Sequence, residues 1–237
     1  MEIIISIALV QAASAYQRTD KDPDKIHEFH KRLQHYNGGP HNLRQQMLAS
    51  NSRVLKVTTY PPFRMVSRDD LRRTADQILA EQVCKADAIV TGTVLAEKAL
   101  LSADESVLFT DYAIVPDRIL KNSTNASLTS ADAFYLTQPG GKLHIEGGTI
   151  ELRGGAYPPP LYPGRTYLLF MSGLADSKSF KTISGVSTYL DGKNGHPRAV
   201  TESIWQDAVN NFLLPLSWDA LMETIEGILK GCLTDHR

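Results

Sequence analysis

Apolar residues recur at helical spacing in three segments of the chain. The first runs from residue 24 to residue 36, and Asn37-Gly38-Gly39-Pro40 would end a helix there. The second begins near Ser67 and runs to Cys84, and the third follows Ser217, a favourable N-cap residue. We therefore predict one helix near the start of the chain, one before residue 84 and one at the end.

Between residues 84 and 204 the pattern changes to short segments rich in β-branched and aromatic residues, with turn residues between them. After a first strand at 53–60, we predict strands at 88–95, 107–115, 119–122, 133–137, 142–145, 149–152, 166–171, 180–183, 186–190 and 198–201. Gly92 lies inside one of them, where a glycine often marks a bulge or a sharp bend. Strands of this length predict a small barrel or sandwich, so the expected fold class is mainly β with flanking helices (α+β).

The composition is that of a folded protein. Of the 237 residues, 42% are hydrophobic and 22% are charged, which excludes wholesale disorder. No apolar run reaches the roughly 18 residues that a membrane-spanning helix needs. The formal net charge of −1 at pH 7 argues against a protein that binds nucleic acid.

The start of the chain has features of a signal peptide. An apolar run at 4–10 precedes Ala13-Ser14-Ala15, which has the small-x-small form that a signal peptidase prefers, but Met1 and Glu2 supply no basic residue before it. We predict a truncated or atypical signal segment over 1–15, with a buried first strand as the alternative. An exported chain with only two cysteines favours a disulfide between Cys84 and Cys232. The alternative is two unrelated buried thiols.

Two stretches resemble a known family. The run Cys84-Lys85-Ala86-Asp87-Ala88-Ile89-Val90-Thr91-Gly92-Thr93-Val94 resembles the first strand of netrin-like and tissue-inhibitor-of-metalloproteinase-like modules. The stretch from Phe109 to Asn122 looks like their second strand, with Asn122 in place of a glycine, and similar patterns occur in uncharacterised exported bacterial proteins. The resemblance covers about residues 84–172 and implies an OB-type barrel. Protease inhibition does not follow, because Cys84 lies mid-chain without a free α-amine and the family's many disulfides are missing.

Together these features predict four segments. They are a signal segment over 1–15, a polar and mostly helical segment over 16–83, an OB-like barrel with an extra hairpin over 84–204, and a C-terminal helical segment over 205–237.

No motif in the sequence identifies a catalytic site, a cofactor site or a metal site. His27 and His30 lie one helical turn apart and share a helix face, but we expect them to be surface histidines because no further ligands accompany them. Asp111 lies within a predicted strand, and we expect an outward-facing polar residue there rather than a buried functional carboxylate. The sequence does not decide whether a Ser-His-Asp or Cys-His catalytic triad is present, since geometry and not sequence order defines such a triad.

Three tyrosines surround a Pro-rich loop. Tyr157, Tyr162 and Tyr167 form either a recognition surface or a cover over the mouth of the barrel. We therefore predict an exported, non-catalytic binding or interaction module, whose partner is a protein or a small ligand and not a nucleic acid. An enzyme of the hydrolase kind with loop-borne residues is one alternative, and a structural accessory of a larger envelope assembly is the other.

Overall fold

The computed structural model describes about two thirds of the chain. It covers residues 23–34, 42–50, 53–57, 74–122, 128–152, 159–174, 179–183, 188–191, 196–199, 210–211, 213 and 215–232. The signal segment expected over 1–15 lies outside the described residues.

The helices agree with the expected positions, with two differences. They are α2 (Pro23–Leu33), α3 (Leu43–Ala49), α4 (Ala75–Lys85) and α6 (Trp218–Cys232). The short α3 was not predicted; its N-cap residue Asn42 accepts a hydrogen bond from the backbone N–H of Gln45. The prediction of one helix from near Ser67 to Cys84 was wrong in its start, because α4 begins at Ala75. Thr74 before it has an extended backbone, and the side chain of Gln77 accepts a hydrogen bond from the Thr74 backbone N–H. Ser67 itself lies outside the described residues.

The strands follow the predicted pattern. They are β1 (Val54–Val57), β2 (Ala88–Leu101), β3 (Leu108–Asn122), β4 (Phe134–Pro139), β5 (Gly141–Ile145), β6 (Gly148–Leu152), β7 (Thr166–Gly173), β8 (Ser179–Thr182), β9 (Thr188–Asp191) and β10 (Pro197–Ala199). The two strands predicted on either side of Pro116 form one long strand, β3. The described chain is therefore mainly β with flanking helices, as expected.

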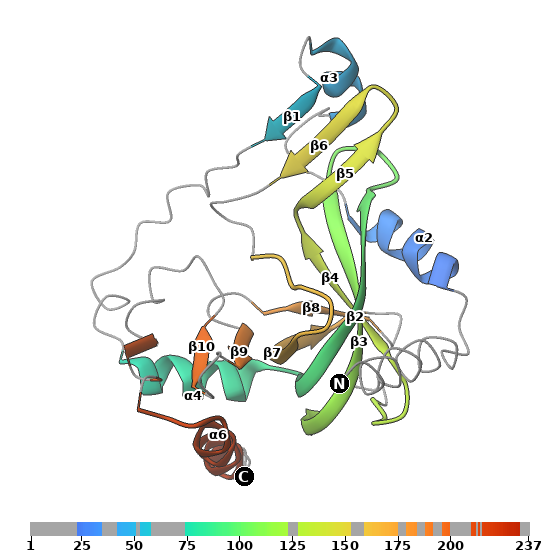
Figure 1. The fold of residues 1–237 in the computed structure, drawn as a ribbon. Helices are drawn as coiled ribbons and strands as arrows, with labels where there is room; N and C mark the ends of the chain where they lie inside the picture. The colour runs from blue at the N-terminus through green and yellow to red at the C-terminus, as the bar shows by residue number, and fades with distance from the viewer. Residues whose placement is uncertain are drawn as a thin grey trace, which may run out of the picture.

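Seven strands form one sheet in the order β10-β9-β7-β2-β3-β4-β8. Strand β8 pairs in parallel with β4 and antiparallel with β7, so the pairings lead from β7 through β2, β3, β4 and β8 back to β7. A second sheet of three strands has the order β1-β6-β5 and lies at the far end of β2 and β3, under α3 (Figure 1).

The predicted bulge at Gly92 is confirmed. Gly92 lies opposite Pro116, and the register of β2 against β3 shifts between Thr91 and Gly92. A Cβ on Gly92 would come within 2.9 Å of the Val115 carbonyl oxygen, so the close approach of the two backbones requires a residue without a side chain.

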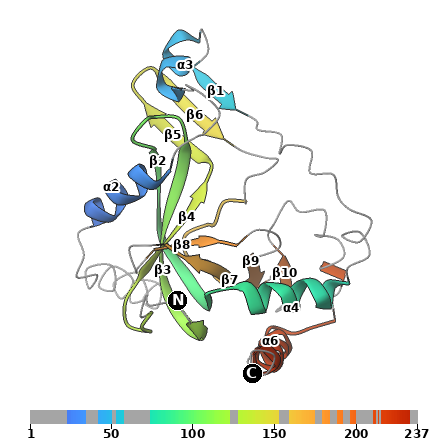
Figure 2. The same ribbon diagram turned by 180° about the vertical axis from the view of Figure 1, so that it is seen from behind.

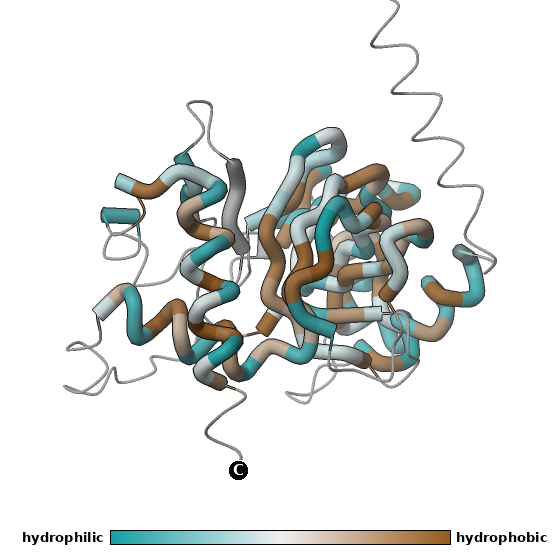
Figure 3. Tube along the Cα trace, turned by 90° about the horizontal axis from the view of Figure 1, so that it is seen from below, coloured by the Kyte–Doolittle hydropathy of each residue, from teal (hydrophilic) through white to brown (hydrophobic). Residues whose placement is uncertain are grey.

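The apolar residues form layers on both faces of the large sheet. One cluster lies inside the ring of pairings, and another packs the outer face of β2 and β7 against α4 and α6. A smaller cluster lies under α2, on the far side of β2 and β3 from α4 and α6 (Figures 1 and 2). Figure 3 shows hydrophobic segments concentrated along the central strands. The sheet therefore has helices on two sides, and α2 covers the strands that carry the site described below.

The predicted disulfide between Cys84 and Cys232 is present and joins the ends of α4 and α6. It adds a covalent link to an interface whose apolar residues already pack together. Among the described residues no helix is both long and apolar enough to cross a membrane.

Candidate functional site: a buried carboxylate under helix α2

Asp111 lies on the outer face of β3, beneath α2. Side chains alternate along a strand, and Tyr112 belongs to the cluster inside the ring whereas Ala113 belongs to the cluster under α2. Asp111 therefore points the same way as Ala113. It is 1% exposed, because α2 covers this part of the sheet. The prediction of an outward-facing polar residue at Asp111 was therefore wrong, because the carboxylate is buried between β3 and α2.

Two histidines of α2 donate hydrogen bonds to this carboxylate. The Nδ1 atoms of His27 and His30 lie 2.7 Å and 2.9 Å from Asp111 Oδ2. Because an ionised carboxylate only accepts hydrogen bonds, both imidazoles carry a proton on Nδ1. The prediction that His27 and His30 are surface histidines was wrong, since they are 4% and 0% exposed. They face the sheet because they share the face of α2 that buries Ile26.

The two hydrogen bonds stabilise a charge in a buried place. Burial opposes ionisation of Asp111, but the hydrogen bonds from His27 and His30 outweigh it and hold the pKa of this carboxyl below its ordinary value of 3.8. Asp111 is therefore an anion at neutral pH. A histidine that donates from Nδ1 has its other ring nitrogen, Nε2, on the opposite edge of the ring, and of the two histidines only His27 lines the pocket described next.

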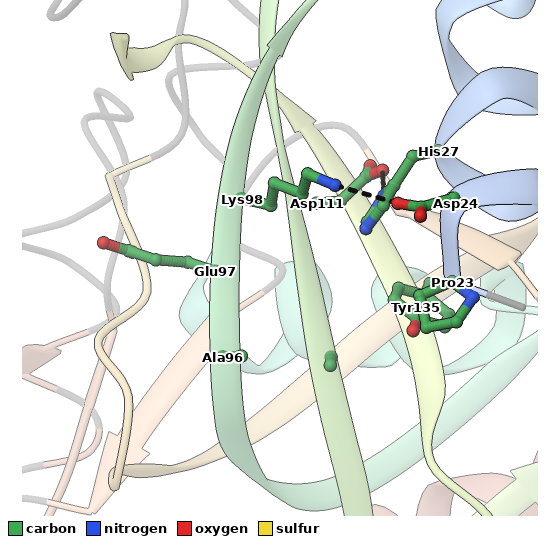
Figure 4. A pocket seen from close by; sticks show the side chains of 9 residues that line it. Pro23, Asp24, His27, Ala96, Glu97, Lys98, Asp111 and Tyr135 are labelled. Carbon is green, nitrogen blue, oxygen red and sulfur yellow. Dashed lines mark hydrogen bonds and ion pairs between the residues drawn. The ribbon is translucent and has the colours of Figure 1, made fainter. Parts of the chain in front are cut away.

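A pocket of about 340 Å³ opens beside the cluster. Its lining comes from α2, β2, β3 and β4, and consists of Pro23, Asp24, His27, Ala96, Glu97, Lys98, Asp111, Ala113 and Tyr135. Lys98 reaches across the pocket to Asp24, with 3.2 Å between Nζ and Oδ1, while the side chain of Glu97 extends away from the other polar groups (Figure 4). The ring of His27 packs edge-on against Tyr135, which limits its rotation.

Two oxygen atoms near the cluster have no hydrogen-bond partner within the described part of the chain. They are Asp111 Oδ1 and Thr137 Oγ1, and both are buried. Asp111 and Thr137 lie directly opposite each other on β3 and β4, so their side chains share one face of the sheet. Asp111 also lines the pocket, but its side chain is 0% exposed, so a donor would reach Oδ1 only after a neighbouring side chain moves aside.

The tyrosines predicted as a recognition surface lie in different surroundings. Tyr162 is 56% exposed, whereas Tyr167 is 1% exposed and its hydroxyl accepts a hydrogen bond from the backbone N–H of Tyr162. Tyr112 accepts one from Leu161 in the same way. Tyr167 thus supports the Pro-rich loop from beneath, and Tyr157 lies outside the described residues.

Asp87, in the first stretch that carries the family resemblance, has a structural role. The carboxylate of Asp87 accepts hydrogen bonds from the hydroxyl of Ser172 and the N–H of Gly173, and so fixes the start of β2 against the end of β7. Ala86 is 1% exposed beside it. The first stretch that carries the resemblance, residues 84–94, therefore lies apart from the pocket, whereas the second, Phe109 to Asn122, contributes Asp111 and Ala113 to its lining.

The cluster and the pocket together define a histidine–carboxylate site on the outer face of a sheet. Such a site is able to bind a hydrogen-bond donor and to exchange a proton. No set of three or more histidine, cysteine or acidic side chains in the described part of the chain is arranged to hold a metal ion. No protein-family model matches the chain, and no curated protein matches it.

Proposed function

We propose that the protein is an exported binding module built on an OB-like barrel, and that the pocket between α2 and strands β2 to β4 is its ligand site. The observation that carries this proposal is the buried carboxylate of Asp111 at the wall of that pocket, which accepts hydrogen bonds from His27 and His30. Ligand sites combine apolar walls with a few convergent polar groups, and the pocket volume lies within the usual range.

The ring of strand pairings supports the barrel. Five strands, β2, β3, β4, β8 and β7, take part in it, which is the number of strands in an OB-type barrel. The netrin-like resemblance of residues 84–172 covers the first strands of that ring and predicts the same architecture.

The disulfide supports export. Disulfides persist in oxidising compartments and are rare in the cytosol, so a Cys84–Cys232 bridge fits a periplasmic or extracellular protein. The signal-like segment predicted over 1–15 points to the same location. Mass spectrometry of the protein from its host would test this, because an uncleaved chain with two alkylatable thiols would contradict export.

The ligand we propose is a small polar molecule with a hydrogen-bond donor. Asp111 Oδ1 has no donor within the described residues, and a buried acceptor without one costs about 1–3 kcal/mol, which a ligand N–H or O–H would recover. The apolar walls formed by Pro23, Ala96 and Ala113 suit a short apolar group next to that donor.

Fragment screening by ¹H–¹⁵N NMR tests the pocket. We expect small alcohols, amides and amines to shift the amide signals of α2 and β3, and Ala96→Phe to abolish these shifts by filling the pocket. Glu223→Phe on the exposed side of α6 is the matched control and should leave them unchanged. Shifts that survive in Ala96→Phe, or no shifts in α2 and β3, would contradict the proposal.

A further inference from the structure

We infer that the pocket also has a hydrolytic activity. His27 acts as the general base that activates water, Asp111 orients His27, and Lys98 stabilises the oxyanion formed from a small neutral carboxylic ester. This inference rests on the proposed ligand pocket and adds chemistry to it.

The geometry of His27 is that of a general base. Its Nδ1 donates to Asp111, which leaves the Nε2 lone pair for a proton from another molecule. The Nε2 atom makes no hydrogen bond to a described residue, and the side chain lines the pocket while being only 6% exposed. In Figure 4 the second ring nitrogen points away from Asp111. Because the His27 side chain is mostly shielded from bulk solvent, its Nε2 atom would contact a water bound in the pocket rather than exchange protons freely with the solvent.

Asp111 is a positioning residue that works through His27. A carboxylate on Nδ1 holds the imidazole in one tautomer and stabilises the imidazolium that forms when Nε2 takes a proton. His30 donates to the same oxygen of Asp111, so it keeps the carboxylate in place from the next turn of α2. His30 is fully buried and is not a second base.

Lys98 supplies the positive charge. It lies directly opposite Asp111 in the β2–β3 register, so the two side chains leave the sheet on the same face as neighbours. Its ammonium crosses the pocket toward Asp24, and both of these side chains remain partly exposed. An ammonium beside a forming oxyanion stabilises the transition state more than the neutral ester.

The charges select a neutral substrate. Asp24 and Asp111 line the pocket against the single ammonium of Lys98, so we expect phosphate esters and other anions to bind poorly. A pocket of about 340 Å³ admits only a small molecule. A small neutral ester fits both limits, and one that also carries a hydroxyl or amide N–H supplies the hydrogen-bond donor proposed for Asp111 Oδ1.

The reaction is a direct hydrolysis by water. The water oxygen bonds to the carbonyl carbon while His27 Nε2 takes one water proton, and the π electrons of the carbonyl move to its oxygen beside Lys98. When the carbonyl re-forms, the C–O bond to the alcohol breaks, and the leaving oxygen takes the proton from Nε2. The products are one carboxylic acid and one alcohol, and His27 returns to its starting state.

Hydrolysis of p-nitrophenyl acetate by the full protein is the test. We expect His27→Gln to lower kcat/KM by about 10²-fold, the usual contribution of a general base. His144→Gln is the matched control, because His144 lies on β5 and contacts Thr149. It should retain the wild-type rate. Lys98→Met should lower kcat with little change in KM.

Chemical rescue separates a base from a structural histidine. Once the hydrolysis that imidazole causes without protein is subtracted, added imidazole should restore turnover to His27→Ala and leave the rate of His144→Ala unchanged. For Asp111, we expect Asp111→Asn to lower kcat at least tenfold with KM within twofold, since the amide keeps the hydrogen bond but not the charge.

The outcomes distinguish this inference from the proposed function. Turnover that is absent, or equal in wild type and His27→Gln, overturns the hydrolytic inference even when fragments bind the pocket. If no fragment binds the pocket of the wild-type protein, the proposed function is overturned as well. Rescue of His27→Ala by imidazole supports both the hydrolytic inference and the proposed ligand pocket.

Discussion

Replacement of Asp111 by alanine should destabilise the protein and loosen α2. The substitution leaves the Nδ1 donors of His27 and His30 without their acceptor. A buried donor without a partner costs about 1–3 kcal/mol. The unpaired donor of His30 should account for most of this loss in stability, because His30 is fully buried. The loss from His27 should be smaller, because His27 faces the pocket and water partly replaces its acceptor. We expect a total loss of about 2–4 kcal/mol in the free energy of unfolding.

Urea unfolding followed by circular dichroism measures this loss. Asp24→Ala is the matched control, because it breaks the Lys98–Asp24 pair on the same pocket, whose side chains are 49% and 82% exposed. Such a pair contributes at most about 1 kcal/mol. Hydrogen exchange should show faster exchange in α2 for Asp111→Ala only. A loss below about 1 kcal/mol, or equal losses in the two variants, would refute the argument that the histidines depend on Asp111.

Three further predictions concern stability. The double variant Cys84→Ser/Cys232→Ser should lose about 5 kcal/mol of unfolding free energy in urea, because the bond closes a loop with a sequence separation of 148; no loss would refute the loop-closure estimate. Gly92→Ala should lose about 1–3 kcal/mol in the same assay, because its Cβ would meet the Val115 carbonyl oxygen, and wild-type stability would contradict that crowding. Asp111 has a lowered pKa, so its contribution is present above the ordinary carboxyl value of 3.8 and is lost as pH falls below it. The stability difference between wild type and Asp111→Asn should therefore shrink in acid, and a difference that grew would contradict the sign.

Local patterns in the sequence predicted most of the secondary structure. The apolar face from Ile26 onward predicted α2, and Ser217 marks the start of α6, where its hydroxyl accepts the N–H of Ala220. The short α3 was missed because seven residues show too little periodicity, and its start depends on the Asn42 side chain.

The site could not be predicted in the same way, because it joins residues far apart in the chain. Asp111 and His27 are 84 positions apart, and nothing local to either indicates that α2 lies over β3. The available signal was the position of His30, four residues after Ile26 and therefore on the apolar face of the helix. A histidine on the buried face of a helix needs a partner, and a carboxylate inside a predicted strand was a candidate.

A buried charged cluster stabilises a protein less than apolar residues often would, which argues that Asp111 has a role in function and not only in stability. Apolar residues of similar size often stabilise a protein more than a buried charged cluster, by about 1–4 kcal/mol. We therefore expect the triple variant Asp111→Leu/His27→Leu/His30→Leu to unfold at the same or a higher urea concentration than wild type, with α2 still docked through Ile26 and its apolar neighbours. The same variant should lose ligand binding and ester hydrolysis completely. A triple variant that unfolds more easily than Asp111→Ala would show instead that the cluster exists to hold α2 on the sheet.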